Sequence, residues 1–305
     1  HDFMTQPLET YIEDGWLKAK GTTLGADDGI GVAMTLAILA DNEIKHGPIE
    51  ALFTVSEETG LAGASNLEKD MINGSMLINL DSEDEGEIFI GCAGGINSTI
   101  EFNYSKENVP DNYFFIKLSV DRLHGGHSGD DIDKGFANAN KILARFIYNS
   151  LKKYDIKLCS FNGGNLHNAI PRDATAVIAI PNNHKEDIRV DYNIYASDVQ
   201  AEYHITEPEM EFTMESTEKQ TTCIDNNTAK NFIYAVHAVV NGVYAMSMDM
   251  PGLVETSSNL ASVRTSESTI KIIASHRSSV MSALHSVRDT VAATFLLAGA
   301  DFKHN

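Results

Sequence analysis

The sequence predicts an α/β domain with a mainly parallel sheet over residues 1–94, followed by an α+β domain over residues 95–305. In the first ninety residues, apolar strand-like runs at 49–56 and 76–80 alternate with helical patterns, which is typical of a parallel sheet. The pattern changes near the glycine-rich stretch 91–95. Beyond it, the predicted elements repeat the order βαββα, which indicates two lobes over about residues 95–205 and 206–300.

The first domain is predicted to open with a hairpin over residues 9–19, because Asp14-Gly15 is a strong two-residue turn signal between strand-like segments. Next comes a helix between Ile30 and Leu39, which is apolar nearly all round and is therefore expected to be buried. A short helix at 61–70 is expected to connect the two strands.

In the second domain we expect six strands and four helices that divide into two halves. The expected strands lie near 113–121, 155–162, 174–181, 208–215, 253–264 and 268–276. The expected helices lie near 133–151, 185–201, 226–241 and 280–298. The strand near 208–215 is assigned to the start of the second lobe, and the halves are expected to superpose as a pseudo-two-fold pair.

The bulk composition excludes several classes of partner. With 305 residues, 43% of them hydrophobic, the chain can bury a sizeable core, and its net charge of −20 argues against nucleic acid and anionic membranes as partners. Three cysteines without a CxxC spacing suit a reducing compartment, so a cytoplasmic location is expected. The sequence shows no signal peptide and no apolar run near the ~20 residues that a membrane span needs.

Acidic residues follow both predicted strands of the first domain and precede its helix. Asp27 stands before the helix, Glu57 and Glu58 follow the first strand, and Asp81 follows the second. Each alone is most simply a solvated turn residue. Because ligands bind at the carboxyl ends of strands in open α/β sheets, acids gathered there would repel one another and favour a bound cation. The spacing therefore indicates a carboxylate metal site.

The segments around these acids resemble the M20 metallopeptidases, and in particular their branch of Xaa-His and cytosolic non-specific dipeptidases. The resemblance extends over essentially the whole chain. It rests on the strings Gly-Thr-Thr-Leu-Gly-Ala-Asp-Asp-Gly-Ile-Gly at 21–31, Phe-Thr-Val-Ser-Glu-Glu-Thr-Gly at 53–60, Leu-Ile-Asn-Leu-Asp-Ser-Glu at 77–83 and Gly-Cys-Ala-Gly-Gly at 91–95.

The resemblance implies that two divalent cations are bridged by Asp27 and held by Glu58 and Asp81, with Glu57 as general base. Zinc is favoured, with cobalt and manganese as alternatives. Residues 1–94 then form part of the catalytic domain, and 95–305 form the lid. Members of the family place a His-x-Asp motif upstream and a final His ligand near their C-terminus. Neither motif is found in this chain, so we expect the His ligands outside it and the segment alone to be inactive.

Three lid residues acquire roles from the same resemblance. His127 lies in Gly-Gly-His-Ser-Gly at 125–129, Asn168 in Asn-Ala-Ile-Pro at 168–171, and Arg277 ends the strand-like run at 270–277. A surface His, an Asx-turn Asn and a strand-capping Arg are the plainer interpretations. By resemblance His127 donates a hydrogen bond to the scissile carbonyl. In one-lobed relatives this His comes from the partner subunit, but the repeated βαββα order leads us to expect that His127 acts on the site of its own chain. Asn168 and Arg277 bind the substrate, because a guanidinium can hold a carboxylate bidentately.

The expected function is metal-dependent hydrolysis of dipeptides, with a small peptide as substrate and a homodimer as the possible assembly. Another M20 hydrolase activity, such as an N-acyl-amino-acid deacylase or tripeptidase, is the alternative within enzymes. A non-catalytic lid module is the alternative for this segment alone.

Overall fold

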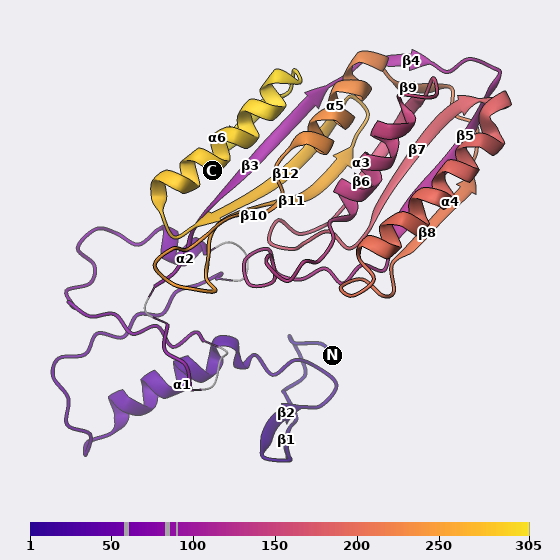
Figure 1. Ribbon diagram of the computed structural model, residues 1–305. Coiled ribbons are helices and arrows are strands. Elements are labelled where there is room, and N and C mark those ends of the chain that lie inside the picture. Colours follow the sequence, from indigo (N-terminus) through magenta and orange to yellow (C-terminus); the bar gives the residue numbers. More distant parts are fainter. Residues whose placement is uncertain (58–60, 83–85, 90, 305) are drawn as a thin grey trace. The chain divides into compact units, whose positions relative to one another are not determined.

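A computed structural model describes residues 1–57, 61–82, 86–89 and 91–304. Contacts divide the chain into unit 1, His1–Phe89, and unit 2, Ile90–Asn305 (Figure 1). No helix among the described residues is long and apolar enough to cross a membrane.

Unit 1 begins with the predicted hairpin. Strands β1 (Thr10–Glu13) and β2 (Trp16–Ala19) pair antiparallel, with Glu13 opposite Trp16. Asp14 and Gly15 both have positive φ, 53° and 84°, as a tight primed turn requires. Helix α1 (Ala26–Ala40) contains the predicted 30–39 segment, and α2 (Ala62–Ser65) is a shorter form of the helix expected at 61–70.

The parallel sheet predicted for the first domain is not present among the described residues of unit 1. Segments 49–56 and 76–80 form no strand ladder, and the exposed fraction of the apolar side chains Leu77 and Ile78 is 81% for each. The predicted burial of α1 is also wrong: Gly31 alone is buried in it, and the Ile30 side chain is 58% exposed. An apolar run specifies a strand only when other strands pair with it, and β1 and β2, the described strands of unit 1, pair with each other instead.

Unit 2 is built on one nine-stranded antiparallel sheet. The strand order is β13-β3-β12-β11-β6-β7-β5-β8, and β10 pairs with one half of β11. The strands are β3 (Gly94–Asn103), β5 (Tyr113–Asp121), β6 (Lys157–Gly163), β7 (Ala174–Pro181), β8 (Glu211–Ser216), β10 (Gly242–Met246), β11 (Val254–Thr265), β12 (Thr269–Ser278) and β13 (Asp301–His304). A separate small sheet pairs β4 (Lys106–Asn108) with β9 (Thr222–Ile224).

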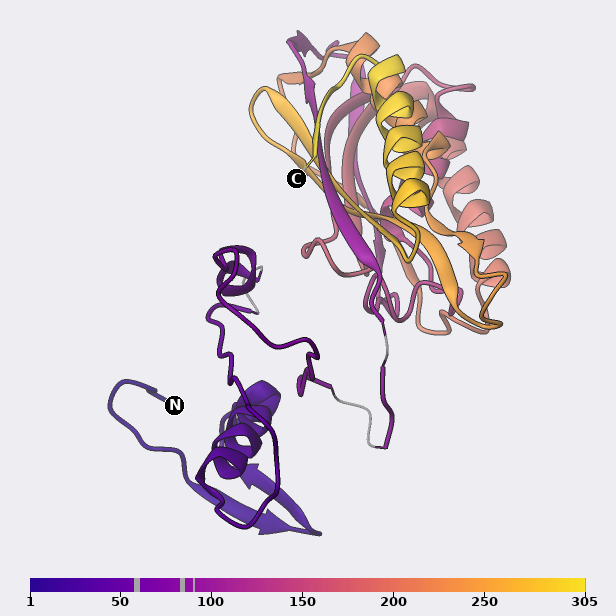
Figure 2. The same ribbon diagram turned by 90° about the vertical axis from the view of Figure 1, so that its left-hand side faces the viewer.

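The four long helices of unit 2 lie on one face of this sheet (Figures 1 and 2). They are α3 (Ala139–Ser150), α4 (Lys185–Glu202), α5 (Asn226–Ala238) and α6 (Met281–Leu297), and a 3-10 turn, η1 (Asn182–His184), precedes α4. The core between helices and sheet includes the fully buried Phe161, Phe232 and Phe295. The four helices and six strands predicted for this region are confirmed.

The two halves of unit 2 share one topology, βαββαβ. The first half runs β5-α3-β6-β7-α4-β8 with strand order β8-β5-β7-β6, and the second runs β3-α5-β11-β12-α6-β13 with strand order β13-β3-β12-β11. They join where β6 meets β11, at Gly163 and Val263.

The predicted division into lobes needs one correction. The strand expected near 208–215 is β8, and it pairs with β5, so it completes the first half and does not begin the second. The second half instead takes its outer strands from β3 and β13, which the sequence pattern did not reveal. The first half is inserted between β3 and α5 of the second half. The sequence analysis assumed that each half is one continuous segment, and that assumption does not allow one half to lie within the other.

Candidate functional site

In unit 1, the predicted acidic residues gather around Asp81. Its carboxyl group shares a hydrogen bond with the Asp27 side chain, and the charges of Asp28 and Glu57 act on it as well. Partial burial, followed by these acidic neighbours, raises the pKa of Asp81. Asp27 lies where α1 begins, after Gly25 in a left-handed conformation with φ 74°. Asp27, Asp81 and Glu57 are thus brought together, whereas Glu58 lies outside the described residues.

The donor atoms of this acidic cluster suit a hard or borderline divalent cation. Carboxylates held against one another are destabilised unless a proton or a cation relieves their repulsion, and here the acidic neighbours add to burial in raising the pKa of Asp81. Among the described residues, no group of three or more His, Cys, Asp or Glu side chains is arranged to hold a metal. The residues present therefore fit part of a metal site, for which Glu58 is a predicted further ligand.

In unit 2, a glycine-rich loop presents His127. Gly125 and Gly126 have φ of 74° and 125°, and a Cβ on Gly126 would lie 2.6 Å from an Asp131 carboxylate oxygen, so this turn requires glycine. The same carboxylate accepts the His127 backbone N–H at 2.6 Å. The loop is thereby fixed before the imidazole makes any contact of its own.

The loop that carries Asn168 runs beside the His127 loop. The backbone N–H of Ser128 donates to the Asn168 carbonyl oxygen at 2.7 Å, and His127 forms an isolated antiparallel bridge with Ala169. From the second half, Asn259 Nδ2 donates to the Ala169 carbonyl oxygen at 2.8 Å. The loop that carries the half-buried Asn168 is therefore held by contacts from both halves of unit 2.

Arg277, near the end of β12, reaches the imidazole of His127. Arg277 Nη2 lies 3.2 Å from His127 Nε2, while the other ring nitrogen, Nδ1, lies 2.7 Å from an Asp130 carboxylate oxygen. Two buried polar atoms beside this contact, Arg277 Nε and Ser128 Oγ, have no hydrogen-bond partner in the described part of the chain. Such atoms are costly to leave unsatisfied and indicate a place for a polar ligand.

Two contributors to this site were missed by the sequence analysis. Asp130 could have been noticed, since it stands three residues after His127 in the same glycine-rich string. Asn259 carries no comparable signal, because a lone Asn within a strand rich in Ser and Thr does not reveal which loop it contacts.

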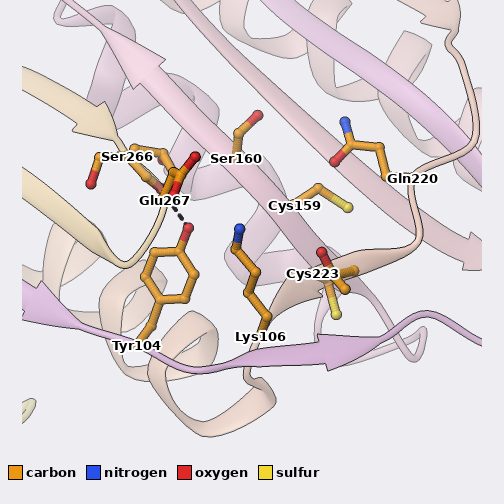
Figure 3. Close-up of a pocket in the computed structure, with 10 residues that line it drawn as sticks. Tyr104, Lys106, Cys159, Ser160, Gln220, Cys223, Ser266 and Glu267 are labelled. Carbon is orange, nitrogen blue, oxygen red and sulfur yellow. Dashed lines mark hydrogen bonds between the residues drawn. The ribbon is translucent and has the colours of Figure 1, made fainter.

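A separate surface pocket of about 250 Å³ lies elsewhere in unit 2 (Figure 3). Its lining includes Tyr104, Lys106, Cys159, Gln220 and Cys223. Burial raises the pKa of the Cys159 thiol to about 12, which leaves it protonated and a poor nucleophile or metal ligand at neutral pH. Tyr104 Oη donates to the Ser266 carbonyl oxygen at 2.6 Å, so this group is already satisfied. The pocket contains none of the predicted site residues.

Comparison with known proteins places these geometries in context. Residues 122–207 match the peptidase dimerisation domain of the M20 type. Over 272 residues the chain is 40% identical to the cytosol non-specific dipeptidase of Escherichia coli (strain K12), a match covering 89% of the chain and 56% of that protein. The crystal structure of aminoacylhistidine dipeptidase from Vibrio alginolyticus matches with a TM-score of 0.85 and 39% identity, covering 100% of the chain and 62% of that protein.

These matches confirm the resemblance to the M20 peptidases that the motifs indicated. The chain spans a little over half the length of both relatives, 56% of one and 62% of the other.

Proposed function

We propose that this chain belongs to a metal-dependent enzyme that hydrolyses dipeptides. The proposal is supported by the match of residues 122–207 to the M20 peptidase dimerisation domain and by the similarity of the chain to dipeptidases. The substrate class is Xaa-His or broader, in keeping with the names of both relatives. A cytoplasmic location is proposed from the name of the E. coli relative.

In this proposal Asp27, Glu58 and Asp81 would hold two divalent cations. Zinc is the first choice, with cobalt or manganese as alternatives. Bound cations would supply a nucleophilic water at neutral pH and polarise the peptide carbonyl. Glu57 would remove a proton from the attacking water and return it to the leaving amine. The gathering of Asp27 and Asp81 with Glu57 nearby supports these assignments.

The lid residues would recognise the carboxylate end of the dipeptide. Arg277 offers a planar fork whose buried Nε has no partner within the described chain, and it contacts His127, whose loop runs beside the Asn168 loop. A carboxylate can accept two parallel N–H bonds from such a fork. Capture of the free C-terminus would restrict the enzyme to short peptides and place the scissile carbonyl within reach of His127, which would stabilise the developing oxyanion.

The observation that carries the proposal is the hydrogen bond between Asp27 and Asp81 beside Glu57. The test uses protein expressed from the full reading frame, stripped with a chelator and reloaded with zinc. We expect restored hydrolysis of Xaa-His dipeptides, and its loss in Asp81→Asn but not in the matched control Asp70→Asn, an exposed acid of the same unit. Faster hydrolysis of N-acetyl amino acids or tripeptides would favour the alternative M20 activities, and metal-independent turnover would contradict the proposal.

We also propose a homodimer in which His127 acts on the site of its own chain, since both halves of unit 2 contribute to the contact between His127 and Arg277. Full-length Asp27→Ala and His127→Ala proteins would each be inactive. If His127 acts within its own chain, mixing the two variants leaves the mixture inactive. Recovery of activity in mixed dimers would instead show that His127 acts across the dimer.

A further inference from the structure

The contacts of His127 determine which of its ring nitrogens carries the proton. A guanidinium has only N–H donors, so His127 Nε2, 3.2 Å from Arg277 Nη2, must accept. The ring is then neutral with its proton on Nδ1, which donates to the Asp130 carboxylate at 2.7 Å. The Asp130 backbone N–H also lies near Nδ1, but at 3.3 Å, so the shorter contact with the carboxylate decides the tautomer.

This tautomer cannot perform the role proposed for His127. Stabilising a carbonyl oxygen requires an N–H that points at it, and here Nδ1–H is engaged by Asp130 while Nε2 is occupied by Arg277 as an acceptor. The imidazole becomes a donor at Nε2 only if Arg277 leaves that nitrogen and a proton takes its place.

The surroundings of Arg277 would allow a carboxylate to compete with His127 for its guanidinium. Its Nε is buried without a hydrogen-bond partner among the described residues, as is the nearby Ser128 Oγ. The backbone of Gly129 packs on the guanidinium, because a Cβ there would lie 3.3 Å from Arg277 Cδ, Cζ and Nε. A carboxylate that bridged Nε and one Nη would satisfy the orphaned donor and would replace a neutral acceptor by a charged one, which makes a shorter and stronger hydrogen bond.

We infer that Arg277 withholds His127 from catalysis until a carboxylate binds. Capture of the substrate's carboxylate by the guanidinium frees His127 Nε2, which takes up a proton from solvent, and Asp130 stabilises the resulting imidazolium. Asp130 is thus a positioning residue for His127. The inference rests on the proposed function and deepens it: substrates with a free carboxylate are selected in kcat as well as in KM, because the carboxylate completes the site.

The test needs no turnover. In the ¹⁵N-labelled 305-residue chain, the two ring nitrogens of His127 are followed by NMR, assigned with His127→Gln, and the Arg277 Nε resonance reports ligand capture. Without ligand we expect a proton on Nδ1 only. Excess free alanine should shift Arg277 Nε and protonate His127 Nε2, whereas alaninamide, which lacks the carboxylate, should change neither.

Variants separate this coupling from a general effect of ligand. Arg277→Ala should abolish the response of His127 to alanine, while Arg189→Ala, which removes a surface arginine of α4, should preserve it. Asp130→Ala should weaken the protonation of Nε2 by alanine, and Asp133→Ala, an exposed acid of the same loop, should not.

Three results would overturn the inference: a proton on Nε2 before any ligand is added, equal responses to alanine and alaninamide, or no response of either Arg277 or His127 to alanine. Each is independent of whether the full-length protein hydrolyses dipeptides. Failure of the coupling can therefore be told apart from failure of the proposed function.

Discussion

The two units of this chain differ in how their apolar residues are used. In unit 2 the side chains of Phe161, Phe232 and Phe295 are fully buried between helices and sheet. In unit 1 the apolar helix α1 is largely exposed, and Leu36 on it is 53% exposed. Yet unit 1 carries the strongest chemical motif, the acids Asp27, Glu57 and Asp81. The difference shows that a motif can identify a site in a segment whose own packing is sparse, whereas a fold is specified by burial.

The largest expected effect is a loss of catalytic rate on substitution of an acid in unit 1. In the full-length protein, Glu57→Gln should lower kcat by about 10²–10⁴-fold, because the amide cannot accept the water's proton. Metal content, measured by elemental analysis, should be unchanged, as should the urea midpoint of unit 2. Glu68→Gln, at an exposed acid of the same unit, serves as the control. Full activity with bound metal would remove Glu57 from the role of base.

A paired substitution tests the contrast in packing directly. Phe232→Ala should destabilise unit 2 by about 3–5 kcal/mol, because a buried aromatic ring leaves a cavity. Leu36→Ala should change stability by only about 0.5 kcal/mol, as substitutions at exposed positions usually do. Trp16, the single tryptophan of the chain, reports on unit 1 by fluorescence, while circular dichroism follows the helices of unit 2 during urea unfolding. Equal effects of the two substitutions would erase the distinction.

A smaller effect is expected from pH in unit 2. His276 is fully buried between the hydroxyls of Ser98 and Ser258, at 2.9 and 3.1 Å. Burial, with the charge of Arg288 adding to it, lowers the pKa of His276 to about 4 from the ordinary 6.5. The unfolded chain therefore binds more protons between these values. Stability is complete above pH 6.5 and is lost as the pH falls toward 4, by about 3 kcal/mol in total.

The measurement is the urea midpoint of unit 2 across this pH range. His276→Gln should remove this part of the pH dependence, whereas His285→Gln, at an exposed position of α6, should retain it. A midpoint with the same slope in His276→Gln would assign the dependence to other groups.

Much of unit 2 was predictable because its helices and strands are indicated by local sequence patterns. The periodicity in 139–150 and 226–238 and the apolar run in 174–181 correspond to observed helices and a strand, and the strand expected near 253–264 is observed as β11. The pairing of β8 with β5 was not predictable, because the same strand could serve either half and the choice depends on contacts distant in sequence. In unit 1, strand propensity at 76–80 predicted a strand that forms no ladder, since propensity cannot provide a partner.

The candidate site was predictable to a similar, uneven degree. The motifs named His127, Asn168 and Arg277, but they could not show that Arg277 contacts the imidazole itself. The role of Asn259 could not be predicted, because its side-chain amide donates to the carbonyl oxygen of Ala169, which lies 90 residues earlier in the sequence.

The nesting of one half of unit 2 within the other has a consequence for how the chain acquires its structure. The first half is contiguous from β5 to β8, so it can form as soon as those residues have left the ribosome. The second half has its first strand, β3, synthesised before the first half and its remaining elements afterwards. Pairing β3 with β12 and β13 closes a long loop that contains the whole first half, and closing such a loop is entropically costly. Both edges of β3 therefore stay unpaired until β12 and β13 have been synthesised and pair with it. Folding of this unit should therefore proceed from the inside outward, with the inserted half serving as the template on which the enclosing half assembles.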